Sequence, residues 1–148
     1  AQGLGLLDTE TILGREKCTF QVSGKAAFAG REFDVKGYEI HMGESIVRGA
    51  PFAAITERNG SVVSVEDGCS SSDGRVCGTY IHGIFDNDAF RDALLGALRG
   101  AKGLGPLASD GEPGRSFAGI REDAIERLAA VVAGSLDMKA ILRIAGLA

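Results

Sequence analysis

The sequence is poor in the residues that build disulfide frameworks and metal sites. It contains only three cysteines and two histidines among 148 residues. The cysteines, Cys18, Cys69 and Cys77, are odd in number and widely spaced, and no Cys-x-x-Cys pair occurs. Such a set argues against a disulfide framework and favours a reducing, cytoplasmic setting. Because zinc needs clustered cysteine and histidine ligands, the sequence predicts no metal site.

A basic block and a long apolar run are also missing. Lysine and arginine total 16 against 20 acidic residues, which gives a net charge of −4. This balance excludes a nucleic-acid footprint and favours small molecules or proteins as partners. No apolar stretch is long enough to cross a bilayer. The beginning, AQGLGLLDTE, has neither a basic region nor an initiating methionine, so we expect no secretory signal and a chain that is part of a longer polypeptide.

Strand patterns fill the first half of the chain. A hydrophobic content of 45% predicts one globular domain over residues 1–148. Alternating apolar and polar residues predict strands at 17–23 and 27–41, joined by a turn at Gly24. The pair Asn59-Gly60 predicts an antiparallel hairpin between strands at 52–56 and 61–65.

Helical patterns follow in the second half. Asp86 or Asn87 is expected to cap a helix over residues 88–99. Residues 100–115 are rich in glycine and proline and lack periodicity, which predicts a flexible surface loop. Apolar residues then recur at helical spacing, so we expect a helical tail at 116–148 whose apolar stripes belong to the core. Strands followed by helices predict an α/β or α+β layered domain.

His82 is the first candidate for chemistry. It ends a short apolar run at residues 75–81, predicted to be a buried strand, and precedes a turn that opens a helix. A strand fixes the backbone while the following loop leaves the imidazole reachable, which suits a general base. A base needs a nucleophile, but no Gly-x-Cys-x-Gly or Gly-x-Ser-x-Gly elbow occurs. Cys69 in a polar turn and Cys77 inside the predicted strand are not expected to be nucleophiles.

The stretch KGYEIHMG brings three further candidates together, Tyr38, Glu39 and His41. Side chains alternate along a strand, so Glu39 and His41 are expected on the same face. This pair could orient a catalytic group, or it could be a structural pair, and both readings stay open. The glycine-containing start, GLGLLDTETI, lacks the third glycine and the preceding strand of a phosphate loop, so no nucleotide site is predicted.

Three motifs in order, GLGLLDTET, GYEIHMG and GTYIHGIFDNDAFR, resemble the C-terminal portion of the glutamine amidotransferase domain of the cobyric acid synthase family, ligases of cobalamin biosynthesis. The resemblance implies a flavodoxin-like class I α/β fold, here a mixed sheet with a hairpin and then C-terminal helices. It also implies a cysteine that attacks the side-chain amide of glutamine. His82 matches the histidine that activates this thiol. The imidazole is needed because a free thiol, with a pKa of about 8.5, is mostly protonated at neutral pH.

The resemblance places other parts of the enzyme elsewhere. The nucleophile and oxyanion hole belong to a segment that precedes GLGLLDTET, so this chain is expected to hold half a Cys-His dyad and to be inactive alone. Many class I relatives orient the histidine with an acidic residue two positions later; Ile84 stands there, which leaves Glu39 or Asp86 as candidates.

The remaining implications concern the parent enzyme. An N-terminal synthetase domain would use the ammonia, with ATP and magnesium, to amidate carboxylates of adenosylcobyrinic acid a,c-diamide. The implied partners are therefore glutamine, the upstream amidotransferase half, that synthetase domain and the corrinoid, and no cofactor is expected in this chain. Two alternatives remain: a sister amidotransferase such as cobyrinic acid a,c-diamide synthase, or a non-catalytic amidotransferase-like binding module. A cysteine elbow upstream in the parent reading frame would favour an enzyme.

Overall fold

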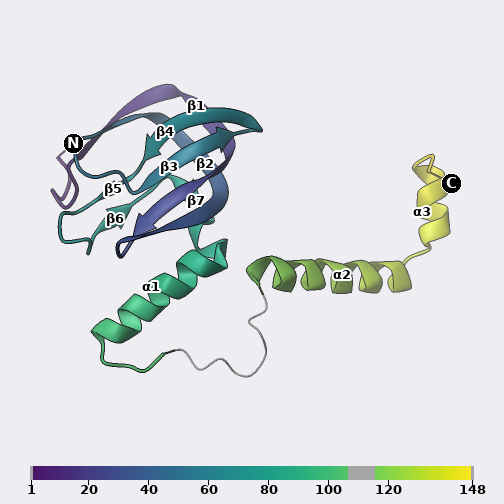
Figure 1. Ribbon diagram of the computed structural model, residues 1–148. Helices are drawn as coiled ribbons and strands as arrows, with labels where there is room; N and C mark the ends of the chain where they lie inside the picture. The colour runs from purple at the N-terminus through teal and green to yellow at the C-terminus, as the bar shows by residue number, and fades with distance from the viewer. Residues whose placement is uncertain (1, 107–115, 148) are drawn as a thin grey trace. The chain divides into compact units, whose positions relative to one another are not determined.

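A computed structural model describes residues 2–106 and 116–147 (Figure 1). The structure forms two compact units, Ala1–Ala108 and Ser109–Ala148. The first unit holds all the described strands and one long helix, and the second holds two helices. The chain is thus of the α/β class, with a sheet that contains a hairpin and with helices toward its C-terminus.

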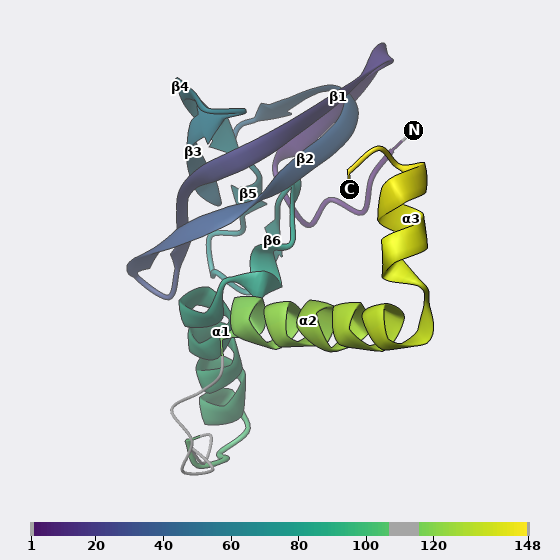
Figure 2. The ribbon, with the colours of Figure 1, turned by 90° about the vertical axis from the view of Figure 1, so that its right-hand side faces the viewer.

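The first unit is built on a curled five-stranded sheet (Figure 2). Its strand order is β4-β3-β1-β2-β7, and every pairing between these described strands is antiparallel. A separate two-stranded pair, β5 with β6, follows β4 in the chain. The strands are β1 (Thr9–Phe28), β2 (Arg31–Val47), β3 (Ala53–Arg58), β4 (Ser61–Asp67), β5 (Cys69–Ser70), β6 (Cys77–Gly78) and β7 (Ile81–His82).

The turn between β1 and β2 lies at Ala29 and Gly30, so the predicted turn at Gly24 is wrong. Both turn residues have positive φ, 49° and 73°, as a two-residue hairpin turn requires. Gly24 lies inside β1, where β3 approaches so closely that a Cβ would stand 2.3 Å from the carbonyl oxygen of Ala54. Glycine at this position permits strand packing and does not mark a turn.

The predicted Asn-Gly hairpin is confirmed between β3 and β4. Asn59 and Gly60 have φ values of 48° and 80°, which suit this turn. The backbone N–H of Asn59 donates to the carbonyl oxygen of Gln21 at 2.9 Å, and the Gln21 N–H donates to the Asn59 side chain at 2.8 Å. The turn is therefore tied to β1 as well as to its own two strands.

The hydrophobic core lies where helix α1 (Asp88–Ala101) packs on the sheet. Phe90 is the buried residue of this helix, and its ring meets three phenylalanine rings edge to face at centroid distances of 5.9 to 6.0 Å. Leu95 and Leu98 of the same helix are exposed. The other rings belong to Phe28, Phe33 and Phe52, and the core also contains Val22, Ala26, Val35, Ala53, Ile55, Ile81 and Ile84.

The predicted single strand over residues 75–81 is wrong, because the run is divided between β6 and β7. Thr79 and Tyr80 interrupt it by bonding to Asp67: the Thr79 hydroxyl and the Tyr80 N–H both donate to that carboxylate. Cys77 is exposed, so it does not behave as the small buried hydrophobe that the strand prediction implied.

The second unit consists of α2 (Phe117–Ser135) and α3 (Met138–Ile144), where helical spacing predicted helices. Side chains cap both N-termini, since Ser116 accepts from the N–H of Gly119 and Asp137 from that of Ala140. Neither helix buries a residue, so their predicted core stripes are exposed. Most of the predicted loop at 100–115 lies outside the described residues. Among the described helices none is long and apolar enough to span a membrane.

Candidate functional site

His82 is presented at the edge of the sheet by a two-residue pairing. β7 joins β2 through the pairs Tyr38↔His82 and Glu39↔Ile81. Opposite residues in an antiparallel pair point to the same face, so Tyr38 and His82 share the outer face of the sheet. Their rings stack with centroids 5.1 Å apart and planes inclined by 16°. The imidazole is exposed, and no hydrogen bond to it comes from the described residues. The ring is therefore oriented by stacking and remains open to a further partner.

Gly37 makes this pairing possible. A Cβ at this position would stand 2.3 Å from the carbonyl oxygen of His82 and 2.7 Å from the Cγ2 of Ile81. Any other residue would force β7 away from β2. The glycine of GYEIHMG thus determines where the histidine of YIHG sits, a link between the two motifs that local pattern does not reveal.

Asn87 fixes the loop that follows His82. It occupies the N-cap of α1 as predicted, but its side chain makes no capping hydrogen bond. Its Oδ1 accepts from the N–H of Lys36 at 2.8 Å, while its Nδ2 donates to the carbonyl oxygens of Lys36 at 2.9 Å and Ile84 at 3.0 Å. The side chain therefore bridges β2 and the short helix η1 (Ile84–Asp86), which begins two residues after the imidazole.

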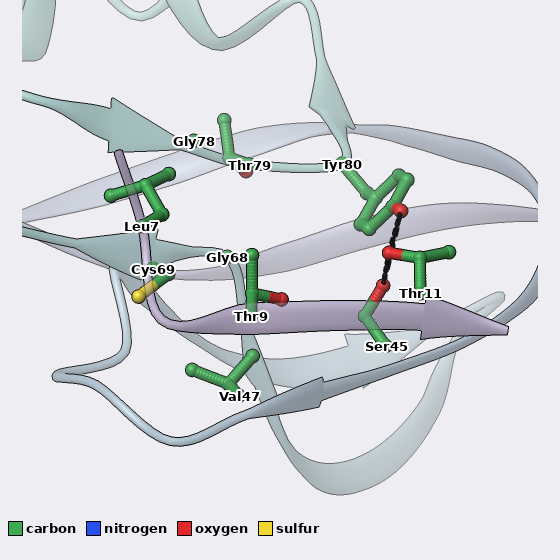
Figure 3. A pocket seen from close by; sticks show the side chains of 10 residues that line it. All are labelled: Leu7, Thr9, Thr11, Ser45, Val47, Gly68, Cys69, Gly78, Thr79 and Tyr80. Carbon is green, nitrogen blue, oxygen red and sulfur yellow. Dashed lines mark hydrogen bonds between the residues drawn. The ribbon is translucent and has the colours of Figure 1, made fainter. Parts of the chain in front are cut away.

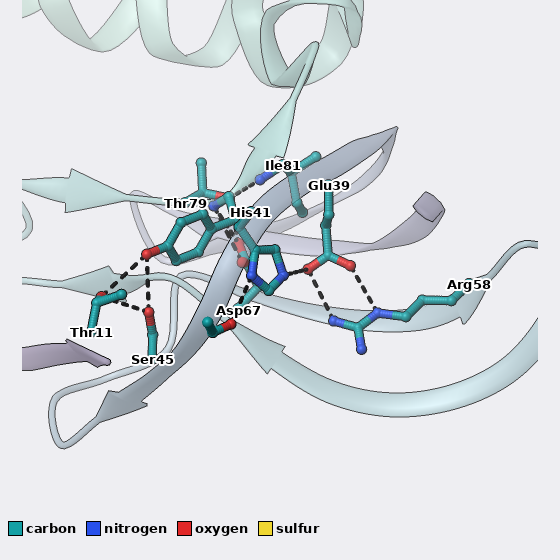
Figure 4. A network of polar contacts seen from close by, with 10 residues as sticks. Thr11, Glu39, His41, Ser45, Arg58, Asp67, Thr79 and Ile81 are labelled. Atoms are coloured by element: carbon teal, nitrogen blue, oxygen red, sulfur yellow. Dashed lines mark hydrogen bonds and ion pairs between the residues drawn. The ribbon is translucent and has the colours of Figure 1, made fainter. Parts of the chain in front are cut away.

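Neither predicted orienting carboxylate reaches the imidazole. Glu39 lies on the opposite face of β2 from His82, because side chains alternate along a strand. It is buried and pairs with Arg58 through two bonds, Nε to Oε2 at 2.8 Å and Nη2 to Oε1 at 3.0 Å (Figure 4). Asp86 is exposed, and within the described part of the chain no hydrogen bond or ion pair joins it to His82.

Glu39 and His41 share a face, as the alternation predicted. The Nε2 of His41 lies 3.9 Å from the Oε1 of Glu39, and its Nδ1 donates to the carbonyl oxygen of Gly43 at 3.0 Å. The imidazole also packs on Tyr80 at a centroid distance of 5.0 Å. This histidine is held by partners on several sides, which distinguishes it from His82.

Asp67 completes the buried charges on the inner face of the sheet. Its carboxylate accepts from the Thr79 hydroxyl and from the N–H of Tyr80 at 3.2 Å (Figure 4). Burial raises its pKa, the two hydrogen bonds lower it in part, and the negative charge of Glu39 raises it again. A groove of about 400 Å³ lies beside Asp67 and Glu39 and also exposes Cys18.

A second hollow of about 240 Å³ lies between the N-terminal segment and the β5–β6 pair (Figure 3). Its polar wall is a hydroxyl cluster: Thr11 lies 2.8 Å from Ser45, and Tyr80 lies 3.2 Å and 3.0 Å from these two oxygens. Cys69 is buried beside it. His82 lines neither hollow, and no group of three or more potential metal ligands occurs among the described residues.

No cysteine of the described chain is positioned as a partner for His82. Cys18 pairs with His41 across β1 and β2 and opens onto the inner groove. Cys69 and Cys77 belong to the separate β5–β6 pair. The sequence predicts no nucleophile at Cys69 or Cys77, but it holds no local signal for the parts that Gly37, Asn87 and Arg58 play in organising the two faces.

Comparison with known proteins defines the class. The profile of the CobB/CobQ-like glutamine amidotransferase domain matches residues 1–90. The chain belongs to this family of glutamine amidotransferase domains.

Individual relatives are more specific, and they confirm the resemblance found in the sequence. The chain is 42% identical over 154 residues to a cobyric acid synthase of Thermoanaerobacter sp. (strain X514) and 44% identical over 155 residues to one of Caldanaerobacter subterraneus. Each match covers 97% of this chain and 29% of the relative. A cobyric acid synthase of Geobacillus sp. (strain WCH70) is 46% identical over 86% of the chain and 24% of its own length. The chain thus spans less than a third of these curated relatives. No solved structure matches.

Proposed function

We propose that this chain supplies the histidine-bearing part of a glutaminase site in a cobyric acid synthase. His82 is the catalytic base, and the upstream half of the same amidotransferase domain contributes the cysteine and completes a flavodoxin-like class I fold. The observation that supports this role is an exposed imidazole whose backbone is fixed by Gly37 and Asn87, whose ring stacks on Tyr38, and which has no thiol partner in the described chain.

The proposed chemistry uses the imidazole twice. His82 accepts the proton of the thiol, and the thiolate attacks the side-chain carbonyl carbon of glutamine. The imidazolium then returns the proton to the departing nitrogen, so ammonia leaves and a thioester remains. His82 next accepts a proton from water as the water attacks the thioester, which releases glutamate and regenerates the thiol. Alone, the chain lacks the nucleophile for this sequence and is inactive.

The ammonia is proposed to pass to an N-terminal synthetase domain of the same cytoplasmic enzyme. There ATP and magnesium would activate the side-chain carboxylates of adenosylcobyrinic acid a,c-diamide, and ammonia would form the amides. The cofactors are assigned to that domain and none to this chain. The names of the relatives favour this assignment over cobyrinic acid a,c-diamide synthase.

The test is ammonia release from glutamine by this chain co-expressed with its upstream half. We expect the pair to be active, the chain alone to be silent, and His82→Ala to lower the rate by about a hundredfold or more. Lys25→Ala, at an exposed ion pair of the same sheet, is the matched surface variant and should leave the rate unchanged. An inactive pair, or an active His82→Ala pair, would favour the binding-module alternative.

A further inference from the structure

The outer face of β2 changes character where β7 joins the sheet. In the first part of the strand this face carries exposed charged residues, and after Gly37 it carries exposed apolar ones that are interrupted only by Glu44. An antiparallel sheet that faces water presents polar residues on that side. The apolar second part of this face of β2 is therefore typical of a surface that contacts another segment. The charged residues of the first part are Glu32, Asp34 and Lys36. The apolar ones, named here the outer β2 strip, are Tyr38, Ile40, Met42 and Ile46, between 37% and 46% exposed.

The outer β2 strip begins at the candidate catalytic residue. Tyr38, its first member, stacks on His82. β7 pairs with β2 only through Tyr38 and Glu39, so in the described part of the chain no strand pairs with residues 40–47 on the side away from β1. Unpaired backbone groups at such an edge can accept an added strand. An apolar face and a free edge therefore both start beside the imidazole.

We propose that the outer β2 strip is the docking surface for the thiol-bearing half of the amidotransferase domain. This inference rests on the proposed function, because a nucleophile must come within hydrogen-bond reach of His82. The thiol has to approach the outer face, where the ring stands, and a segment packed on the strip is held beside it. The matched cobyric acid synthases carry ample polypeptide for this role, since this chain spans only 29% of two of them.

The experiment places a charge in the strip and measures association. The tagged chain is co-expressed with the thiol-bearing half, and the amount of that half retained on the tag is compared for Ile40→Asp, Met42→Asp and the unaltered chain. Each strip variant should weaken retention by about tenfold or more, because a carboxylate would be buried without a partner. Val62→Asp is the matched control, since Val62 is an apolar residue of β4, at the opposite edge of the sheet, and is 90% exposed. It should retain the partner fully.

Two measurements separate docking from folding. Circular dichroism and thermal unfolding of each variant chain should match the unaltered chain, because the replaced side chains are exposed. Hydrogen exchange should show amides of residues 40–47 protected in the pair relative to the chain alone. The proposal is overturned if the strip variants retain the partner, if these amides exchange equally fast in both samples, or if the unaltered pair fails to associate. It is also overturned if the variants abolish only self-association, which would make a second copy the occupant.

Ammonia release distinguishes this proposal from the proposed function. A pair carrying His82→Ala should associate normally and lose activity. If the strip variants associate normally while activity still depends on His82, only the docking proposal is contradicted. If the strip variants weaken association while the His82→Ala pair stays active, the proposed catalytic role of His82 is wrong and the proposed docking surface is supported.

Discussion

Tyr38 and His82 stack across β2 and β7, so the phenol ring limits how far the imidazole can turn. A base must meet its thiol with the correct nitrogen, and loss of that orientation slows the reaction more than it weakens substrate binding. In the active pair, Tyr38→Ala should lower kcat by about tenfold with little change in the KM for glutamine.

Tyr38→Phe keeps the ring and should restore kcat to near the unaltered value. Steady-state glutamine hydrolysis, measured with the thiol-bearing half at saturation, checks both variants. Equal kcat values for Tyr38→Ala and Tyr38→Phe would contradict a positioning role for the stacked ring.

Asp67 links stability to pH. Its pKa lies above the ordinary 3.8, chiefly because of burial. The folded protein thus binds this proton more tightly than the unfolded chain does. The resulting stabilisation is fully present below pH 3.8 and is lost as pH rises through the raised pKa of the folded state. Asp67→Asn should remove this part of the pH dependence.

Urea unfolding between about pH 3 and pH 7 measures the effect, with the pH slope of the unfolding free energy as the readout. Asp34→Asn, at an exposed ion pair with Lys25, is the control. Its free energy of unfolding should change with pH as that of the unaltered chain does. An unchanged slope in Asp67→Asn would show that this carboxyl is not the group concerned.

At the scale of elements, the junction of β2 and β7 depends on one glycine. Gly37→Ala introduces a Cβ 2.3 Å from the carbonyl oxygen of His82, so β7 must move. We expect a loss of about 1–3 kcal/mol in the free energy of unfolding. Gly96→Ala, where a Cβ in α1 meets nothing within 4 Å, should instead stabilise by about 0.5–1 kcal/mol.

Chemical denaturation of the two variants provides the comparison, and amide exchange near His82 should accelerate only in Gly37→Ala. Equal stabilities for the two variants would mean that β7 tolerates the added methyl group, and that Gly37 does not set the position of the imidazole.

Local signals predicted some elements and failed on others for identifiable reasons. The hairpin at Asn59 and Gly60 was predictable because two adjacent residues determine its turn conformation. Gly24 misled because glycine serves close strand approach as well as turns, and only the position of Ala54 reveals which. The exposed apolar stripe of α2 shows a further limit of prediction from sequence. Helical periodicity identifies an apolar face but does not show which segment covers it.

In the candidate site, too, only the features set by a local pattern were predictable. The shared face of Glu39 and His41 follows from strand alternation alone and was predicted correctly. The bond between Asn87 and Lys36 joins residues 51 positions apart, and Arg58 reaches Glu39 from another strand. Such pairings depend on register, which no local spacing contains. They show that Glu39 belongs to the inner face and is unavailable to His82.

At the scale of the whole molecule, the chain is part of a CobB/CobQ-like amidotransferase domain. Its residue His82 lies on the outer face of the sheet, stacked on Tyr38. The inner face holds the paired charges and the hydroxyl cluster, and Cys18 opens onto the groove on this face. The outer face holds an imidazole and an apolar strip. The central claim is therefore that a thiol from outside the described residues comes to His82.

The most direct test is the pH dependence of alkylation of the cysteine in the upstream half, measured in the co-expressed pair by mass spectrometry. With His82 present, the thiol should react at about pH 7, with an apparent pKa below the ordinary value of about 8.5. With His82→Ala, the profile should move to about 8.5 or above. Identical profiles in the two pairs would contradict the account, because the thiol and the imidazole would then not be partners.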